Sequence, residues 1–223
     1  MPIAFVQSTI QAPGTVSSGS LAFASANTQG GLLLACFRTG TTDEVNPSIT
    51  DTLGNTYSSI FNVPSSLVGR SYGFYAKDIS SGPNTVSFVH TSAVLTRWAI
   101  HEYSGIDTVS PLDQVGSTIG KSTTPASPTV GITTGNELLF GWGAAERNPV
   151  WTAGTSYNLR VASSTLKIFS EDIVVSSTGT YRANAFLSSS GGWTMTIVTF
   201  FGTAAGAGSV VKPRLLGLLG VGA

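Results

Sequence analysis

The sequence predicts an all-β fold, an antiparallel β-sandwich of the jelly-roll-like type built from two similar four-strand halves. The first observation is that short alternating apolar-polar segments and β-branched or aromatic runs dominate, whereas helical periodicity is hard to find. The second is that Gly, Pro, Asn, Asp and Ser cluster between these segments at near-regular spacing. The third is that the second part of the chain repeats the order of the first. Many short strands at such spacing are typical of a sandwich or barrel.

Turn clusters at residues 51–55 and 81–84 separate some of the strands expected in the first part of the chain. The segments expected to form these strands are 3–8, 20–25, 31–38, 48–52, 56–63, 71–79, 84–91 and 97–105. A connector rich in Pro, Ser and Thr is expected to follow, over roughly residues 106–129.

A second set of strands is expected after the connector, and a Ser-Gly-Gly turn at 190–192 precedes its last member. The segments in this set are 129–134, 137–145, 155–163, 166–174, 179–188 and 193–202.

The two sets resemble each other in sequence. GGLLLACF at 30–37 matches NELLFGWG at 136–143, and RWAIHEYSG at 97–105 matches GWTMTIVTFFG at 192–202. In this alignment Trp98 corresponds to Trp193, and Asp78 with Ile79 corresponds to Asp172 with Ile173. We interpret the match as an internal duplication, the alternative being that any two β-segments of this composition look alike.

The halves are expected at roughly 20–105 and 129–202, within a single domain of residues 1–203. One unit has one apolar face and cannot bury it alone, so two units packed face to face are expected to form one sandwich. The strongest strands supply the expected core residues: Leu32, Leu34, Cys36, Trp98, Ile100, Leu139, Trp142, Trp193, Met195, Ile197 and Val198.

Charge and cysteine content exclude several classes of protein. Charged residues make up 10% of the chain and the formal net charge is zero, without the basic stripe that nucleic-acid binding needs. Cys36 is the single cysteine and lies in an apolar run, which predicts a buried thiol and no disulfide framework. No apolar run reaches the length of a membrane-spanning helix, and the first residues lack the features of an export signal.

The sequence predicts no catalytic residue, no cofactor and no metal site. His90 and His101 with Glu102 are the best metal candidate, but Glu102 follows His101 directly and is expected on the opposite face of a strand. Residues 51–55 offer too few oxygen ligands for calcium and are interpreted as a plain turn.

Adjacent acidic residues and scattered aromatics give two further candidates. Glu171 with Asp172, and Asp43 with Glu44, are interpreted as solvated edge or turn charges rather than the facing carboxylates of a glycosidase. Several aromatics could form a sugar platform if they clustered on one face, although a packing role is favoured for each: Trp151, Tyr57, Tyr72, Tyr103 and Tyr157.

The C-terminal segment changes character after the last expected strand. Residues 204–209 have the composition of a flexible spacer, and VVKPRLLGLLGVGA then carries large aliphatic residues around a Lys-Pro-Arg step. We favour an extended docking arm over residues 204–223 that binds a neighbouring subunit, with a disordered remnant as the alternative. The residues expected to bind the partner are Val210, Val211, Lys212, Pro213, Arg214, Leu215, Leu216, Leu218 and Leu219.

Several segments resemble a broad group of uncharacterised Gly/Ser/Thr-rich β-sandwich proteins found in bacteria and among tailed-phage virion proteins. SITDTLGNTYSSI, AIHEYSGIDTVSPLDQ and WTAGTSYNLR carry the resemblance, which covers roughly residues 20–202. The group has no agreed catalytic residues to transfer. The C-terminal segment and the missing export signal favour the phage members.

The resemblance implies a non-enzymatic structural virion protein, most simply a capsid decoration (cement) protein or a head or tail accessory protein. Its expected partners are the major capsid protein or other virion proteins and further copies of itself, and its location is the virion, assembled in the host cytoplasm. The alternative is an extracellular carbohydrate-binding or adhesive module, which includes phage receptor binding and a glycan partner. A jelly-roll glycosidase is a third and weaker hypothesis.

Overall fold

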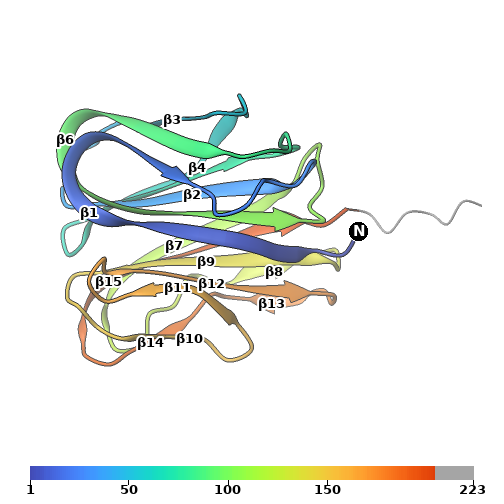
Figure 1. The fold of residues 1–223 in the computed structure, drawn as a ribbon. Coiled ribbons are helices and arrows are strands. Elements are labelled where there is room, and N and C mark those ends of the chain that lie inside the picture. The colour runs from blue at the N-terminus through green and yellow to red at the C-terminus, as the bar shows by residue number, and fades with distance from the viewer. Residues whose placement is uncertain (204–223) are drawn as a thin grey trace, which may run out of the picture.

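The computed structural model describes residues 1–203, and these residues fold as an all-β protein without a helix, which confirms the predicted fold class. None of the residues described could therefore cross a membrane as a helix. Two five-membered runs of antiparallel strands form the main layers (Figure 1).

The first main sheet, sheet 1, belongs entirely to the N-terminal half of the chain. Its strand order is β1-β6-β2-β5-β4, and β3 pairs with the N-terminal part of β6. The bounds are β1 Ala4–Ala22, β2 Leu32–Thr39, β3 Ser48–Asp51, β4 Tyr57–Ser65, β5 Gly69–Ala76 and β6 Thr85–Ser104.

The second main sheet, sheet 2, belongs to the C-terminal half, with the order β11-β12-β9-β15-β7. Two small sheets, β10-β14 and β13-β8, come from the same half. The bounds are β7 Leu112–Ser122, β8 Val130–Ile132, β9 Glu137–Ala145, β10 Trp151–Ala153, β11 Asn158–Ser163, β12 Ile168–Val175, β13 Gly179–Tyr181, β14 Ala185–Leu187 and β15 Gly191–Phe201.

The two main sheets repeat the same strand order, because β1-β6-β2-β5-β4 corresponds to β7-β15-β9-β12-β11. Even a local irregularity is repeated: β4 bulges between Ser59 and Phe61, and β11 bulges between Leu159 and Val161. Across the space between the sheets β1 lies near β11 and β4 lies near β7. Because β1 is equivalent to β7 and β4 to β11, the contacts β1–β11 and β4–β7 are equivalent to each other, as a two-fold relation between the halves requires.

The pairing register corrects two of the sequence matches. Leu33 and Leu139 are equivalent in β2 and β9, and they pair with Glu102 and Thr199, so equivalent residues of β6 and β15 are 97 apart. The same offset holds between β5 and β12, where Leu33 pairs with Ala76 and Leu139 with Ile173.

Trp98 therefore corresponds to Met195 rather than to Trp193, and Asp172 corresponds to Tyr75 rather than to Asp78. A slip of two residues leaves the alternation of a strand unchanged, so the pattern could not detect the shift at Trp98. For Asp172, the sequence alignment placed the identical pairs Asp78-Ile79 and Asp172-Ile173 together, although the strand register makes Tyr75 the equivalent of Asp172.

The strands differ from the prediction in several places. The predicted strand 179–188 is two strands, β13 and β14, in different small sheets, and β10 was not predicted. The predicted connector over 106–129 contains β7, an edge strand whose Gly, Ser and Thr residues imitate a loop. The segments 3–8 and 20–25 belong to one long strand, β1, and 84–91 and 97–105 belong to one long strand, β6. Bulges between Gln11 and Gly14 and between Val16 and Ser18 let β1 bend without ending.

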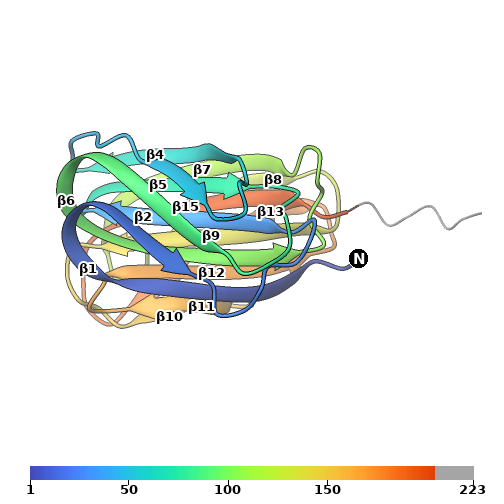
Figure 2. The same cartoon turned by 45° about the horizontal axis from the view of Figure 1, so that its top comes forward.

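The bending of β1 and β6 creates additional layers (Figures 1 and 2). The C-terminal part of β1, the N-terminal part of β6 and β3 cover the outer face of sheet 1, and the two small sheets cover the outer face of sheet 2. Both faces of the central strands β2 and β9 are consequently buried along their whole length. The predicted two-layer sandwich is thus the centre of a four-layer arrangement.

All eleven predicted core residues are buried, as expected. They belong to three separate hydrophobic clusters rather than one. Leu32, Trp142 and Val198 lie in the cluster between the main sheets. Trp98 lies in the cluster under β3, and Met195 lies in the cluster under the small sheets.

Candidate functional site

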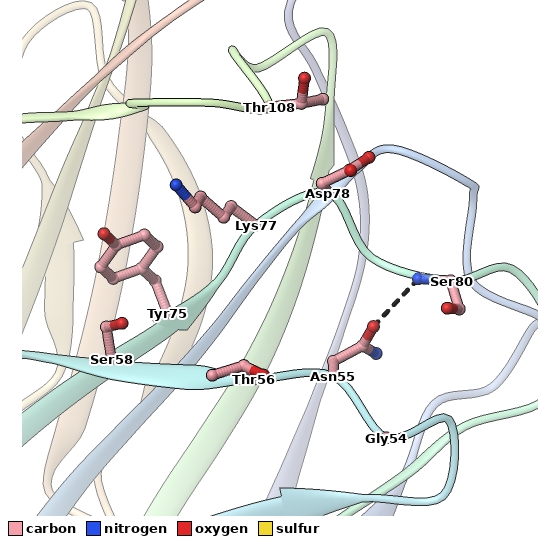
Figure 3. Close-up of a pocket in the computed structure, with 9 residues that line it drawn as sticks. All are labelled: Gly54, Asn55, Thr56, Ser58, Tyr75, Lys77, Asp78, Ser80 and Thr108. Atoms are coloured by element: carbon pink, nitrogen blue, oxygen red, sulfur yellow. Dashed lines mark hydrogen bonds between the residues drawn. The ribbon is translucent and has the colours of Figure 1, made fainter.

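A polar cleft of about 380 Å³ lies at one end of sheet 1 and is a candidate site (Figure 3). Its walls are the turn after β3 with the start of β4, the end of β5 with the loop that follows it, and the loop after β6. Its lining residues are Gly54, Asn55, Thr56, Ser58, Tyr75, Lys77, Asp78, Ser80 and Thr108.

The turn at residues 51–55 is held by one carboxylate. Asp51 accepts hydrogen bonds from the backbone N–H groups of Leu53 and Asn55, at 3.1 and 3.0 Å, and from the side chains of Asn55, Tyr57 and Asn84. Burial alone would raise the pKa of Asp51, but the hydrogen bonds outweigh burial and lower it. The carboxylate is occupied by donors, so this segment is a plain turn, as predicted, that fixes the cleft wall.

The cleft presents hydrogen-bonding groups of several kinds. The Asn55 side-chain oxygen accepts a hydrogen bond from Ser80 N at 3.0 Å, which ties two walls together (Figure 3). The Lys77 ammonium donates to the carbonyl of Val109. Asp78 is exposed, has a φ of 49°, and supplies the only carboxylate among the nine lining residues. The cleft can hold a small polar ligand, but it lacks the carboxylate pair of a glycosidase.

The last described residue leaves the body at the same end as the cleft. Thr203 N donates to Gly105 O at 2.8 Å, and the Thr203 hydroxyl donates to Met1 O at 2.9 Å. Asn136 donates from its side chain to Thr203 O at 3.2 Å. Thr108 of the cleft lies three residues after Gly105, so cleft and exit point are joined by one loop. The nine predicted docking residues between Val210 and Leu219 lie outside the described residues.

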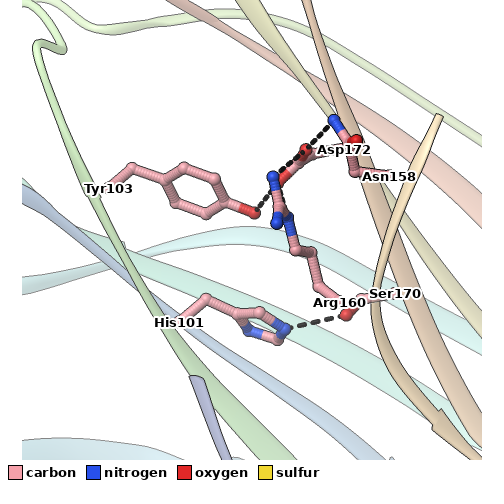
Figure 4. Close-up of polar contacts among 6 residues, drawn as sticks. All are labelled: His101, Tyr103, Asn158, Arg160, Ser170 and Asp172. Atoms are coloured by element: carbon pink, nitrogen blue, oxygen red, sulfur yellow. Dashed lines mark hydrogen bonds and ion pairs between the residues drawn. The ribbon is translucent and has the colours of Figure 1, made fainter. Parts of the chain in front are cut away.

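A second polar cluster crosses the space between the main sheets (Figure 4). Arg160 forms a two-pronged ion pair with Asp172, at 2.6 and 2.9 Å. The Tyr103 hydroxyl donates to Asp172 at 2.7 Å, and the guanidinium lies 4.1 Å from the centre of the Phe5 ring. Burial, and then the Asp172 charge, raise the pKa of Tyr103 well above its ordinary value. Tyr103 belongs to sheet 1 and the ion pair belongs to sheet 2, so the cluster connects the two sheets; Asp172 and Tyr103 are buried, and Arg160 is partly exposed.

The same region holds a histidine–serine pair. His101 Nε2 and Ser170 Oγ are 2.8 Å apart, and both residues are fully buried. Burial, with Arg160 nearby, lowers the pKa of His101 to about 3. A nucleophile and base at this distance would need an open approach for substrate, and neither residue lines any of the four clefts described for residues 1–203. We assign the pair to packing between the sheets.

His90 and His101 with Glu102, the group that the sequence offered but did not favour as a metal site, do not come together. His101 and Glu102 point to opposite faces of β6, as expected: His101 contacts Ser170, whereas Glu102 accepts hydrogen bonds from Gln7 and Asn27. His90 packs against aromatic rings instead. Within residues 1–203 no group of three or more His, Cys, Asp or Glu side chains is placed to hold a metal ion.

Glu171 and Asp172 correct the prediction of solvated charges, because they are 0% and 2% exposed. Strand alternation sends Asp172 into the space between the main sheets. It sends Glu171 to the outer face of sheet 2, where Gly154 N and Asn184 N donate to it at 2.8 and 3.0 Å. Burial raises the pKa of Glu171 to about 7. The apolar residues flanking this pair in LKIFSEDIVV were the missed signal. Asp43 and Glu44 are exposed, as predicted.

The five aromatics considered for a sugar platform do not form one. Trp151, Tyr72 and Tyr103 are buried. Tyr57 donates its hydroxyl to Asp51, and Tyr157 donates to the carbonyl of residue 182. Their packing roles agree with the favoured interpretation.

The cleft residues Lys77 and Asp78 were missed as site residues. In the sequence Asp78 was used only to align the repeats. No local sequence pattern indicates that three separate segments meet at the cleft.

Comparison with known proteins adds no assignment: no family model matches the chain, and no curated protein or solved structure shows significant similarity to it.

Proposed function

We propose that the protein is a non-enzymatic structural component of a larger assembly, of the kind that decorates the capsid or completes the head or tail of a tailed phage. The attachment is made by residues 204–223 together with the end of the body from which they leave. The observation that carries the proposal is the anchoring of Thr203 by Gly105, Met1 and Asn136, directly before a segment rich in large aliphatic residues.

Two features of the body support this role. Its central strands are buried on both faces, which suits a rigid unit under mechanical load. The edge strand β7 exposes Val115 and Ile119, by 40% and 44%, and the cleft end exposes Val109 by 71%. Burying each leucine of the C-terminal segment against a partner would contribute about 1.5–3 kcal/mol. Several such contacts are enough to hold a subunit in place.

Truncation after Thr203 tests the proposal. We expect the full chain to co-sediment with phage particles, or to form oligomers in analytical ultracentrifugation, and the truncated chain to remain monomeric and unbound. A finer variant replaces Leu215, Leu216, Leu218 and Leu219 with serine. The matched control replaces the exposed body residues Val89 and Val150 with serine and should bind normally. Equal binding by the truncated chain would refute the role of the segment.

A second candidate function, glycan binding, is favoured by one observation: the cleft brings Asn55, Tyr75, Lys77 and Asp78 together in a volume suited to one or two sugar rings. A glycan array would detect this activity. A ligand bound in the cleft should lose affinity in K77M and D78N, and keep it in the exposed control R182M. An array without signal would remove this candidate and leave the structural role in place.

A further inference from the structure

Two arginines lie side by side at the other end of the inter-sheet space. Arg38 of β2 and Arg97 of β6 are direct cross-strand partners. They lie on the same strand faces as Cys36 and Ala99, which belong to the cluster between the main sheets, so they face sheet 2. Arg38 is 6% exposed and Arg97 is 7% exposed. Like charges directly opposite each other across a ladder repel, and burial strengthens the repulsion.

The hydrogen bonding of these guanidinium groups is incomplete. Arg38 Nε donates to Val68 O at 2.9 Å, but Arg38 Nη1 is buried without a partner. Arg97 Nε is likewise buried without a partner. Buried polar groups in native proteins are almost always paired, with a bound ion or water where the protein supplies no acceptor. The missing acceptor therefore points to a ligand.

A third cation joins the arginines. Lys167, in the turn between β11 and β12, donates from its ammonium to Glu146 O at 2.8 Å. Its pKa is lowered by burial and then by the positive charges of Arg38 and Arg97, against the opposite effect of Glu146. Burial, and then Arg97, lower the pKa of Arg38 to about 10. Within residues 1–203 the ion pair of Arg160 with Asp172 is the only one within 4.0 Å, so no carboxylate neutralises Arg38 or Arg97.

The residues of sheet 2 that are equivalent to the two arginines are small and include a hydroxyl. By the repeat relation, Ala144 and Thr194 occupy the positions of Arg38 and Arg97. Ser71, the cross-strand partner of Arg38 in β5, lies 3.2 Å from the Thr194 hydroxyl. Guanidinium and hydroxyl groups together are the donors that proteins use for tetrahedral oxyanions.

We propose that Arg38 and Arg97, assisted by Lys167, bind a small tetrahedral oxyanion, a phosphate or sulfate, between the two main sheets. The anion accepts hydrogen bonds from the unpaired N–H groups and neutralises the repulsion between the arginines. This site is separate from the polar cleft and from the C-terminal segment, so it does not depend on the proposed function.

Thermal unfolding in sodium phosphate, compared with sodium chloride at equal ionic strength, tests the site. At a phosphate concentration about one hundred times Kd we expect the midpoint to rise by about 5–10 °C. The variants R38M and R97M should lose this phosphate-specific rise, whereas the exposed control R182M should keep it. Sulfate should act like phosphate.

A second measurement keeps the test valid if a variant fails to fold. In the unaltered protein, phosphate should shift the ¹⁵N–¹H signals of the Nε groups of Arg38 and Arg97, and leave that of Arg182 in place. Equal midpoints in phosphate and chloride, a rise that persists in both variants, or Nε signals that do not move would each overturn the proposal.

Discussion

The two halves of the chain share one backbone plan but fill equivalent positions with different chemistry. In the second half Asp172 of β12 reaches across to Tyr103, at 2.7 Å. The two-fold relation places Tyr75 where Asp172 is and Phe200 where Tyr103 is, and their rings are 5.9 Å apart. One of the two equivalent contacts between the sheets is therefore polar, and the other is aromatic.

The repeated bulge shows the same divergence. Ile60 occupies the extra position in β4, and Arg160 occupies it in β11. The bulge aims each side chain toward the other sheet, and Arg160 uses this direction to pair with Asp172. The two halves thus keep the same backbone geometry while the side-chain chemistry differs. A buried ion pair adds little net stability over an apolar contact, but it penalises any docking that separates the partners.

The largest expected effect comes from breaking the polar contact. D172A leaves Arg160 and Tyr103 without their acceptor, so we expect the free energy of unfolding to fall by about 3–5 kcal/mol, as for other buried pairs that lose one partner. Arg160 is 23% exposed at its side chain, which favours the lower end of that range. Urea unfolding followed by tryptophan fluorescence measures the change.

The matched experiment makes the second half more like the first. R160I with D172L removes both charges and gives β11 the isoleucine of Ile60. Because no buried charge is then left alone, we expect this double variant to be more stable than D172A. A double variant as unstable as D172A would mean that D172A loses stability because the ion pair is gone, rather than because the Arg160 charge is left without a partner.

A smaller effect on stability is expected where the two halves differ in side-chain volume. Gly73 corresponds to Ser170, and a Cβ at Gly73 would collide with the Phe61 ring. In the second half Val161 takes the position of Phe61 and leaves space for the serine. We expect G73S to lose about 1–3 kcal/mol through overpacking.

Phe61 provides the internal control for this prediction. F61V should restore part of the stability of G73S, because it reproduces the pairing of the second half, while lowering the stability of the unaltered protein. Unfolding curves of the four proteins give the coupling energy directly. Additive losses would show that residues 61 and 73 do not compete for the same volume.

The sequence was sufficient for the fold class and for every member of the predicted core, because alternation and apolar runs record burial locally. It was insufficient for the layer count. The run LLLACF in β2 already indicated a strand buried on both faces, but what covers the second face is decided by the bending of β1 and β6, far away in sequence.

The candidate site was harder still to predict from sequence. Lys77 and Asp78 carry no motif, and the loops that surround them meet only after the sheet has formed. In the sequence Arg38 and Arg97 are isolated charges far apart. They become neighbours only through the pairing register between β2 and β6.

The two halves are also expected to respond to pH with opposite sign. Both histidines belong to β6 in the first half, and burial lowers the pKa of His90 to about 4 and of His101 to about 3. The unfolded chain binds more protons than the folded one below about pH 6.5, so these residues reduce stability as the pH falls toward 4.

Glu171 in the second half acts in the other direction. Its pKa is raised to about 7, so its contribution to stability is present below about pH 4.5 and is lost as the pH rises to 7. One pKa unit corresponds to about 1.4 kcal/mol, so each group should change the free energy of unfolding by at most about 3 kcal/mol across its window.

Urea unfolding at intervals between pH 4 and pH 8 separates the two effects. H90L and H101V, the latter carrying the residue that Val198 supplies in the second half, should flatten the loss of stability below pH 6.5. E171Q should flatten the loss between pH 4.5 and 7, whatever its effect on absolute stability. If the histidine variants kept the full acid-dependent loss, the sensitivity would have to come from carboxylates. The contrast between the halves would then be confined to packing.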